Sequence, residues 1–150
     1  MQTSTTSWLK HVLVRNVLGG VLSVSVAWAQ VTGVASQTLA EGLIGYTDLI
    51  GGPTDVAMFT PTLQPGGSLG WHMHPGYVFV VVKTSEVAVY AADGCRSVYA
   101  AGSGFVMPPD EVMNVSNETT ETVELIATAV MPAGSQRTSR VAAPPATCGR

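Results

Sequence analysis

Two histidines, His72 and His74, are the residues of this sequence best suited to chemistry. They stand one residue apart in the segment Gly-Trp-His-Met-His-Pro-Gly, residues 70–76, directly before the apolar run Tyr-Val-Phe-Val-Val-Val. In an extended strand alternate side chains share a face, so both imidazoles project together while Trp71 and Met73 point to the other face. Two imidazoles on one face are half of a site for zinc, copper, iron or nickel. A pair of core or surface histidines without a metal is the alternative interpretation of this spacing.

The N-terminal segment has the three parts of a secretory signal peptide. The first 40 residues contain no acid, and basic residues precede an apolar run, residues 17–29, that ends in an Ala-x-Ala sequence. This run is shorter than the ~20 apolar residues that cross a bilayer. We therefore expect cleavage before Gln30, export to the periplasm or the extracellular space, and no stable membrane insertion afterwards. A mitochondrial presequence is the alternative. Cleavage removes His11 and leaves His72 and His74 as the only histidines.

Export also predicts a disulfide bond. Cys95 and Cys148 are the only cysteines of the chain, and two cysteines in an exported protein usually pair. Their bridge would close a loop of roughly 50 residues and contribute about 4 kcal/mol in the chain-entropy model. It would also fasten the C-terminal tail to the body of the protein. In a cytosolic protein the same two residues would be free thiols.

Length and composition indicate one globular domain and exclude a nucleic-acid partner. The chain has 150 residues, of which 46% are hydrophobic and only 11% are charged. A domain of this length buries a sizeable core. Lys and Arg form no cluster anywhere, whereas proteins that bind nucleic acids carry a basic patch or stripe.

Beyond Val56 the pattern predicts an all-β barrel or sandwich. Short segments rich in Val, Tyr and Thr alternate with turn sequences such as Gln-Pro-Gly-Gly, and no helical period separates them. The chain divides into the leader 1–29, an N-terminal arm or edge strand 30–55, the barrel 56–131 and a C-terminal tail 132–150. The predicted strands are 56–63, 68–73, 77–82, 86–91, 97–101, 104–107, 111–116 and 122–131.

The segment around the two histidines resembles the first motif of the cupin family of small β-barrels. That motif is a Gly, five residues, His-x-His, three or four residues, a Glu, six residues and a Gly. Gly66, His72 and His74 match it, whereas Val78 takes the place of the Glu and Ser85 that of the last Gly.

A second stretch is similar to the second cupin motif, which is a Gly, five residues, Pro-x-Gly, two residues, a His, three residues and an Asn. Gly102, Pro108 and Asn117 match this motif, whereas Asp110 replaces the Gly and Met113 the His. The resemblance extends over roughly residues 56–131. It implies a cupin-type β-barrel, which is a jelly roll or double-stranded β-helix.

Within the family the chain is most similar to small bacterial cupins with the first motif Trp-His-x-His-Pro-Gly-x-Val-x-Val-Val-Val. Their second motif often carries two histidines, which fall on Glu111 and Met113 here. Three alternatives follow. His72, His74 and Glu111 would bind a divalent ion through two imidazoles and a carboxylate. The same histidines with Met113 would form a softer site that favours copper. In the third alternative the metal site is lost, and Val78 and Met113 fill an apolar pocket.

The resemblance implies an exported small cupin that binds a divalent transition metal (Fe, Mn, Zn, Ni or Cu) through His72 and His74. Such a protein would act on a small molecule as an oxygenase or isomerase. The alternatives are a non-catalytic, small-ligand-binding cupin with a degraded metal site and a copper-binding protein that uses Met113. The expected partner is a small-molecule ligand or substrate. An outward-facing Trp71 would suit the interface of a homodimer.

Overall fold

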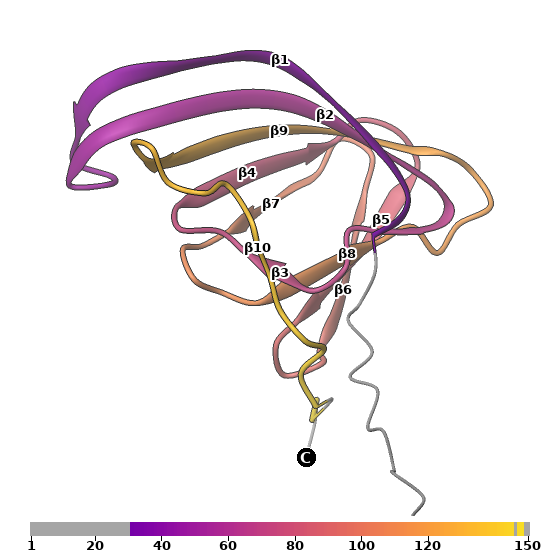
Figure 1. Ribbon diagram of the computed structural model, residues 1–150. Helices are drawn as coiled ribbons and strands as arrows, with labels where there is room; N and C mark the ends of the chain where they lie inside the picture. Colours follow the sequence, from indigo (N-terminus) through magenta and orange to yellow (C-terminus); the bar gives the residue numbers. More distant parts are fainter. Residues whose placement is uncertain (1–30, 146, 149–150) are drawn as a thin grey trace, which may run out of the picture.

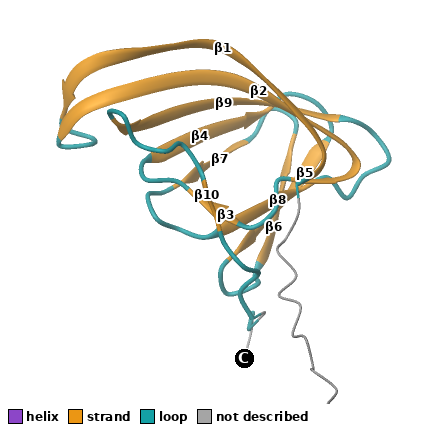
Figure 2. Ribbon diagram, viewed as in Figure 1, coloured by secondary structure: helices purple, strands orange, loops and turns teal. Residues whose placement is uncertain are grey.

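The computed structural model describes residues 31–145 and 147–148, and all of its regular structure is β (Figures 1 and 2). The predicted leader, residues 1–29, lies outside the described residues. No helix among the described residues is long and apolar enough to cross a membrane. The strands are β1 Thr32–Thr47, β2 Gly52–Ser68, β3 His72–Met73, β4 Tyr77–Val82, β5 Glu86–Ala91, β6 Arg96–Ala100, β7 Gly104–Met107, β8 Met113–Ser116, β9 Val123–Pro132 and β10 Ser139–Arg140.

The strands form one antiparallel sheet that curls into a nearly closed barrel. Its order is β10-β3-β8-β2-β9-β4-β7; β1 pairs with β2 outside this path, and β5 pairs with both β6 and β8. Figure 1 shows β2, β9 and β4 as one wall, with β3, β8 and β6 beneath it. The core lies between these walls. The predicted all-β barrel is therefore confirmed.

Strand alternation decides which side chains enter the barrel. In β4, Val78, Val80 and Val82 are buried while Phe79 and Val81 between them are exposed. The long strand β9 repeats this pattern, with Val123, Leu125, Ala127, Ala129 and Met131 buried. Because successive residues of a strand point to opposite faces, this period of two places one row of apolar side chains in the core.

For residues 30–55 the sequence allows either an arm or an edge strand. The structure has an edge strand there, β1. Strand β1 pairs with β2 over most of its length, and the two form a long hairpin across one wall of the barrel. The sequence predicts a single strand over 68–73, but the chain interrupts it. Gly70 has a φ of 71°, which favours glycine, and only His72 and Met73 belong to β3.

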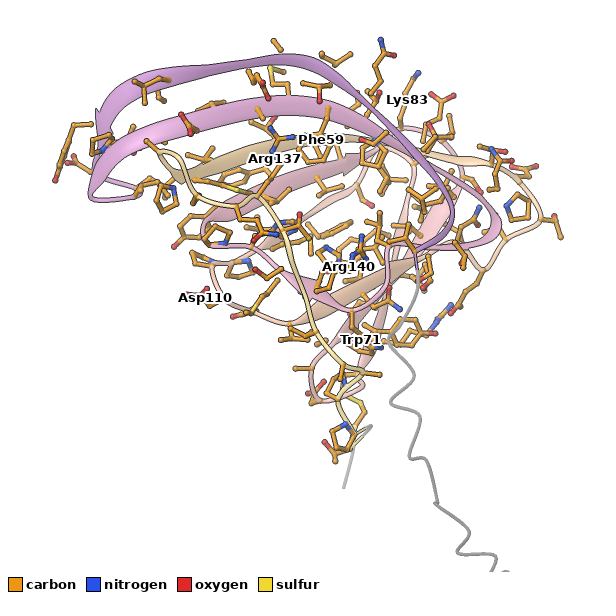
Figure 3. All side chains as sticks on the ribbon, in the orientation of Figure 1. Phe59, Trp71, Lys83, Asp110, Arg137 and Arg140 are labelled. Carbon is orange, nitrogen blue, oxygen red and sulfur yellow. A yellow bond between two sulfur atoms is a disulfide. The ribbon has the colours of Figure 1, made fainter. Side chains whose placement is uncertain are left out.

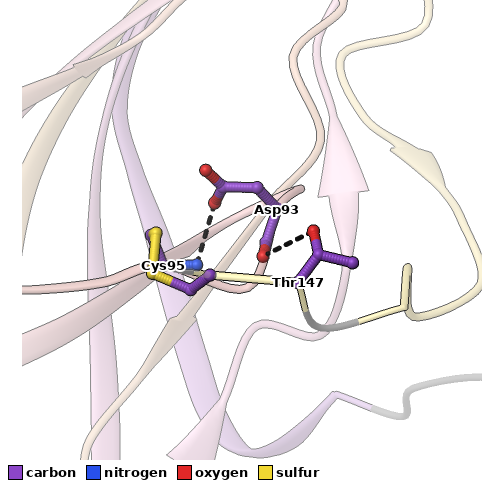
Figure 4. The surroundings of a disulfide bond; sticks show 4 residues. Asp93, Cys95 and Thr147 are labelled. Carbon is purple, nitrogen blue, oxygen red and sulfur yellow. Dashed lines mark hydrogen bonds between the residues drawn. A yellow bond between two sulfur atoms is a disulfide. The ribbon is translucent and has the colours of Figure 1, made fainter. Parts of the chain in front are cut away.

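The C-terminal tail is a structured element, which we call the strap (residues 133–145). Its strand β10 pairs with β3, and the Val141 N–H donates to the Trp71 carbonyl. The strap crosses the open side of the barrel (Figure 1). Beyond it, Cys148 forms the predicted disulfide with Cys95, which is present in the structure. Beside the disulfide, the Thr147 N–H and hydroxyl both donate to the Asp93 carbonyl. Figure 4 shows the bond from the hydroxyl, together with the bond from the Cys95 N–H to the Asp93 carboxylate.

The disulfide should contribute measurably to stability. It joins residues separated by 53 positions, and a closed loop of this size is worth about 4 kcal/mol in the chain-entropy model. We expect Cys95→Ser/Cys148→Ser to lower the free energy of unfolding by up to this amount in a guanidinium titration. Dithiothreitol should destabilise the wild type but not the double variant. Equal midpoints for oxidised wild type and variant would show that the bridge contributes nothing.

Candidate functional site

The two histidines lie side by side on the inner wall of the barrel. His72 and His74 are only 4% and 6% exposed, whereas Trp71 and Met73 are half-buried. The structure therefore places both imidazoles on the inner face, as alternation predicts. Their ring centroids are 4.9 Å apart, and the ring planes are nearly perpendicular at 84°.

Backbone carbonyls fix the orientation of both imidazoles. His72 Nδ1 lies 2.7 Å from the carbonyl oxygen of Gly70, and His74 Nδ1 lies 2.7 Å from that of Arg137 in the strap. A carbonyl oxygen only accepts hydrogen bonds, so each Nδ1 must carry the proton and donate it. In a neutral imidazole the other nitrogen, Nε2, is then an acceptor with a free lone pair.

Burial keeps both histidines neutral. It lowers the pKa of His72 to about 4, against a smaller opposing effect of the hydrogen bond to Gly70. Electrostatic interactions with His74 and Arg140 lower this pKa further, because they disfavour a second positive charge at the site. Burial likewise lowers the pKa of His74, while the hydrogen bond to the Arg137 carbonyl raises it. Since desolvation penalises the charged form of a base, both rings are uncharged near pH 7.

Both histidines line a cavity of about 230 Å³ inside the barrel. Much of its wall is apolar and comes from facing strands, for example Val78 and Val80 of β4, Phe105 of β7 and Leu125 of β9. Neither Asp nor Glu is among its lining residues. The cavity is therefore an apolar chamber with two neutral hydrogen-bond acceptors in its wall.

The strap supplies the polar side of the cavity, and the sequence did not reveal this. Arg137, Thr138 and Arg140 line it together with the histidines. Arg137 pairs with Glu41 of β1 at 2.8 Å, and its guanidinium carbon lies 5.8 Å from the centre of the Phe59 ring (Figure 3). The available signal was that the tail, residues 132–150, contains three arginines and no acidic residue.

The structure does not bring Glu111 to the histidines. Its side chain is exposed, and the described residues contain no group of three or more His, Cys, Asp or Glu that could hold a metal ion. The structure thus leaves Glu111 apart from the two histidines, and the ligand set of His72, His74 and Glu111 stays a prediction. The turn before β8 explains why Glu111 does not reach the histidines. Asp110 has a φ of 59° and donates its N–H to the His74 carbonyl, so the backbone approaches the site here while the Glu111 side chain stays in solvent.

Met113 lies beside the histidines but does not line the cavity. It stands opposite His72 in the β3–β8 ladder, where it is half-buried and packs against the core. The methionine that lines the cavity is Met107 of β7, which the sequence analysis missed. The alternation of β7, with Phe105 and Met107 buried, was the signal that could have identified it. Val78, at the position of the motif's Glu, lines the cavity as an apolar residue.

The donor set does not fit a complete protein-held metal centre. Catalytic zinc sites and mononuclear iron sites generally use three protein ligands. Among the described residues the cavity offers two imidazole nitrogens and no carboxylate. A larger hollow of about 500 Å³ lies beside the β1–β2 hairpin, where Glu41, Asp55 and Arg137 contribute to its wall, but neither histidine lines it.

The burial of His72 predicts a pH-dependent stability. Between pH 6.5 and about 4 the unfolded chain takes up a proton on this residue that the folded protein does not. Stability should therefore fall as the pH falls through this window, by about 3 kcal/mol from His72 alone. In urea titrations from pH 4 to 7, the free energy of unfolding should depend less steeply on pH for His72→Gln than for the wild type. Titration of the His72 ring near pH 6.5, followed by NMR, would contradict this account.

Comparison with known proteins identifies the barrel. Residues 59–129 match the Cupin domain family, whereas no curated protein matches the chain. Among solved structures, a cupin superfamily protein from Desulfitobacterium hafniense DCB-2 is similar over 69% of this chain and 83% of its own, with 12% identity and a TM-score of 0.53. A cupin domain from Bordetella pertussis Tohama I aligns over 69% and 98%, with 18% identity and a TM-score of 0.53.

The polyketide cyclase RemF from Streptomyces resistomycificus is similar over 75% of each chain, with 13% identity and a TM-score of 0.57. At these identities the solved structures establish the cupin fold alone. The family match covers the two histidines and both walls of the barrel, from Phe59 in β2 to Ala129 in β9. Residues 59–129 of this chain therefore belong to the cupin family.

Proposed function

We propose that this cupin binds a small, largely apolar molecule inside the barrel without a resident metal, through a hydroxyl or similar donor on that molecule. One observation carries the proposal. His72 and His74 are neutral, their Nδ1 atoms are bound to backbone carbonyls, and both rings line an otherwise mainly apolar cavity. Their Nε2 atoms are the acceptors left for a ligand.

The size of the cavity limits the ligand. An apolar cavity of ~150 Å³ holds one benzene molecule, so a cavity of about 230 Å³ holds roughly nine or ten non-hydrogen atoms. Binding would remove the apolar body from water, at about 25 cal/mol for each Å² buried. Each hydrogen bond to an Nε2 atom would add about 1 kcal/mol.

The lowered pKa values favour binding over acid–base catalysis. A general base works best with a pKa near the operating pH, whereas burial lowers the pKa of His72 to about 4. Such an imidazole accepts a hydrogen bond but is a weak proton acceptor. The described residues place no carboxylate in the cavity to take over that role.

Phenol and toluene test the proposal, because they share a shape and differ in the hydroxyl donor. We expect metal-free protein in EDTA to bind phenol roughly fivefold more tightly than toluene in isothermal titration calorimetry, as one hydrogen bond of about 1 kcal/mol implies. His72→Leu and His74→Leu should reduce this preference. Continued toluene binding by these variants serves as the control for an intact cavity. Equal affinity for both probes in the wild type, or no binding of either, would refute the proposal.

A divalent metal held by His72 and His74 is a second candidate, favoured by one observation. Metal-ligating histidines almost always donate their other ring N–H to a carboxylate, backbone carbonyl or water, and both of these rings donate Nδ1–H to a carbonyl. An ion held here would have two protein ligands and would supply Lewis-acid chemistry. Water or a small molecule would have to complete its coordination.

Metal analysis separates the two candidates. We expect protein dialysed in turn against Fe²⁺, Mn²⁺, Zn²⁺, Ni²⁺ and Cu²⁺, and then against buffer, to retain less than one ion per chain by mass spectrometry. The His72→Ala/His74→Ala variant is the matched control for ions bound elsewhere. One ion per wild-type chain, absent from the variant, would establish the metal-binding candidate instead.

A further inference from the structure

Arg140 is the described cation that has no carboxylate partner. The described residues contain four Lys or Arg side chains, and three of them form ion pairs: Lys83 with Glu124, Arg96 with Glu118 and Arg137 with Glu41. Within residues 31–145 and 147–148, the side chain of Arg140 donates only to the Leu69 carbonyl, through one nitrogen of its guanidinium group. A guanidinium has five N–H donors, so most of them are free for another acceptor.

Arg140 lies at the cavity that His72 and His74 line. Arg140 stands directly opposite His72 in the β10–β3 ladder, and cross-strand partners project to the same face of a sheet. Arg140 lines the cavity together with both histidines, and its charge is close enough to contribute to the lowered pKa of His72. Figure 3 shows Arg140 on the strap, near the middle of the barrel, and its side chain is exposed.

One of the two positive charges at the cavity has no carboxylate partner among the described residues. The residues that line the cavity include two arginines and no acid. Arg137 is neutralised by Glu41, which leaves the charge of Arg140 beside an apolar chamber. A guanidinium that is held in place and has free donors matches the geometry of a carboxylate, which it can bind through two parallel hydrogen bonds.

We propose that the ligand is a small organic carboxylate and that Arg140 is the residue that binds its anionic group. This inference rests on the proposed function and narrows its ligand class. The carboxylate pairs with the guanidinium, a hydroxyl donates to an Nε2 atom of the histidine pair, and the apolar body fills the chamber. The ladder between β10 and β3 and the hydrogen bond to Leu69 hold the guanidinium in place before binding, which reduces the entropy that a ligand must supply.

The experiment compares acids with their neutral amides. The probes are 3- and 4-hydroxybenzoate, 3- and 4-hydroxybenzamide, and phenol, titrated calorimetrically into metal-free protein at pH 7 and low salt. We expect at least one hydroxybenzoate to bind the wild type at least tenfold more tightly than its amide. In Arg140→Gln this preference should disappear while phenol binding remains. Arg96→Gln, which removes an exposed arginine paired with Glu118, is the matched control and should keep the preference.

The outcomes separate this inference from the proposed function. Equal binding of acids and amides by the wild type would overturn the carboxylate site and leave phenol binding intact. Failure of phenol and toluene to bind would instead overturn the proposed function. If Arg140→Gln also loses phenol binding because the strap detaches from Leu69, Arg140→Lys decides, since it retains the charge. Phenol binding without a preference for the acid in Arg140→Lys would contradict the inference, and a reduced but clear preference would support it.

Discussion

The site depends on how strand β3 is held. Only two residues long, β3 lies between β8 and β10, with His72 opposite Met113 on one side and Arg140 on the other. Gly70 and Arg137 then bind the two Nδ1 atoms through their carbonyl oxygens. Without the strap, His74 would lose the acceptor that fixes its tautomer, and the cavity would lose its polar side. The disulfide at Cys148 fastens the end of this same segment.

Desolvation gives the histidine pair its chemical character. A buried imidazole without a carboxylate neighbour remains neutral, and its fixed Nδ1–H leaves Nε2 as an acceptor. The motif's Glu position carries Val78, whose side chain lines the cavity. With Val78 at this position, the described wall of the cavity contains no carboxylate. The guanidinium of Arg140, which has no carboxylate partner among the described residues, lines the same cavity, and the proposed ligand is therefore acidic.

The sequence predicts the barrel well because strand alternation and turn residues act locally. Val78, Val80 and Val82 in β4 follow the period of two, and His72 and His74 point inward for the same reason. The predicted cysteine pair is joined in the structure. The exposed position of Glu111 could not be predicted because this residue follows a turn with positive φ, where alternation no longer determines the direction of a side chain. The strap could not be predicted because its contacts with His72, His74 and Leu69 join residues more than 60 positions apart.

The central claim is that the Nε2 atoms of two neutral histidines receive the ligand. It is tested most directly by the ¹⁵N chemical shifts of both imidazoles in metal-free protein, with and without saturating 4-hydroxybenzoate. The account predicts Nδ1-protonated rings in the free protein and, on binding, a shift of at least one Nε2 resonance toward the value of a hydrogen-bonded acceptor, with Nδ1 unchanged. Rings protonated at Nε2, or Nε2 resonances that stay fixed although the probe binds, would contradict it.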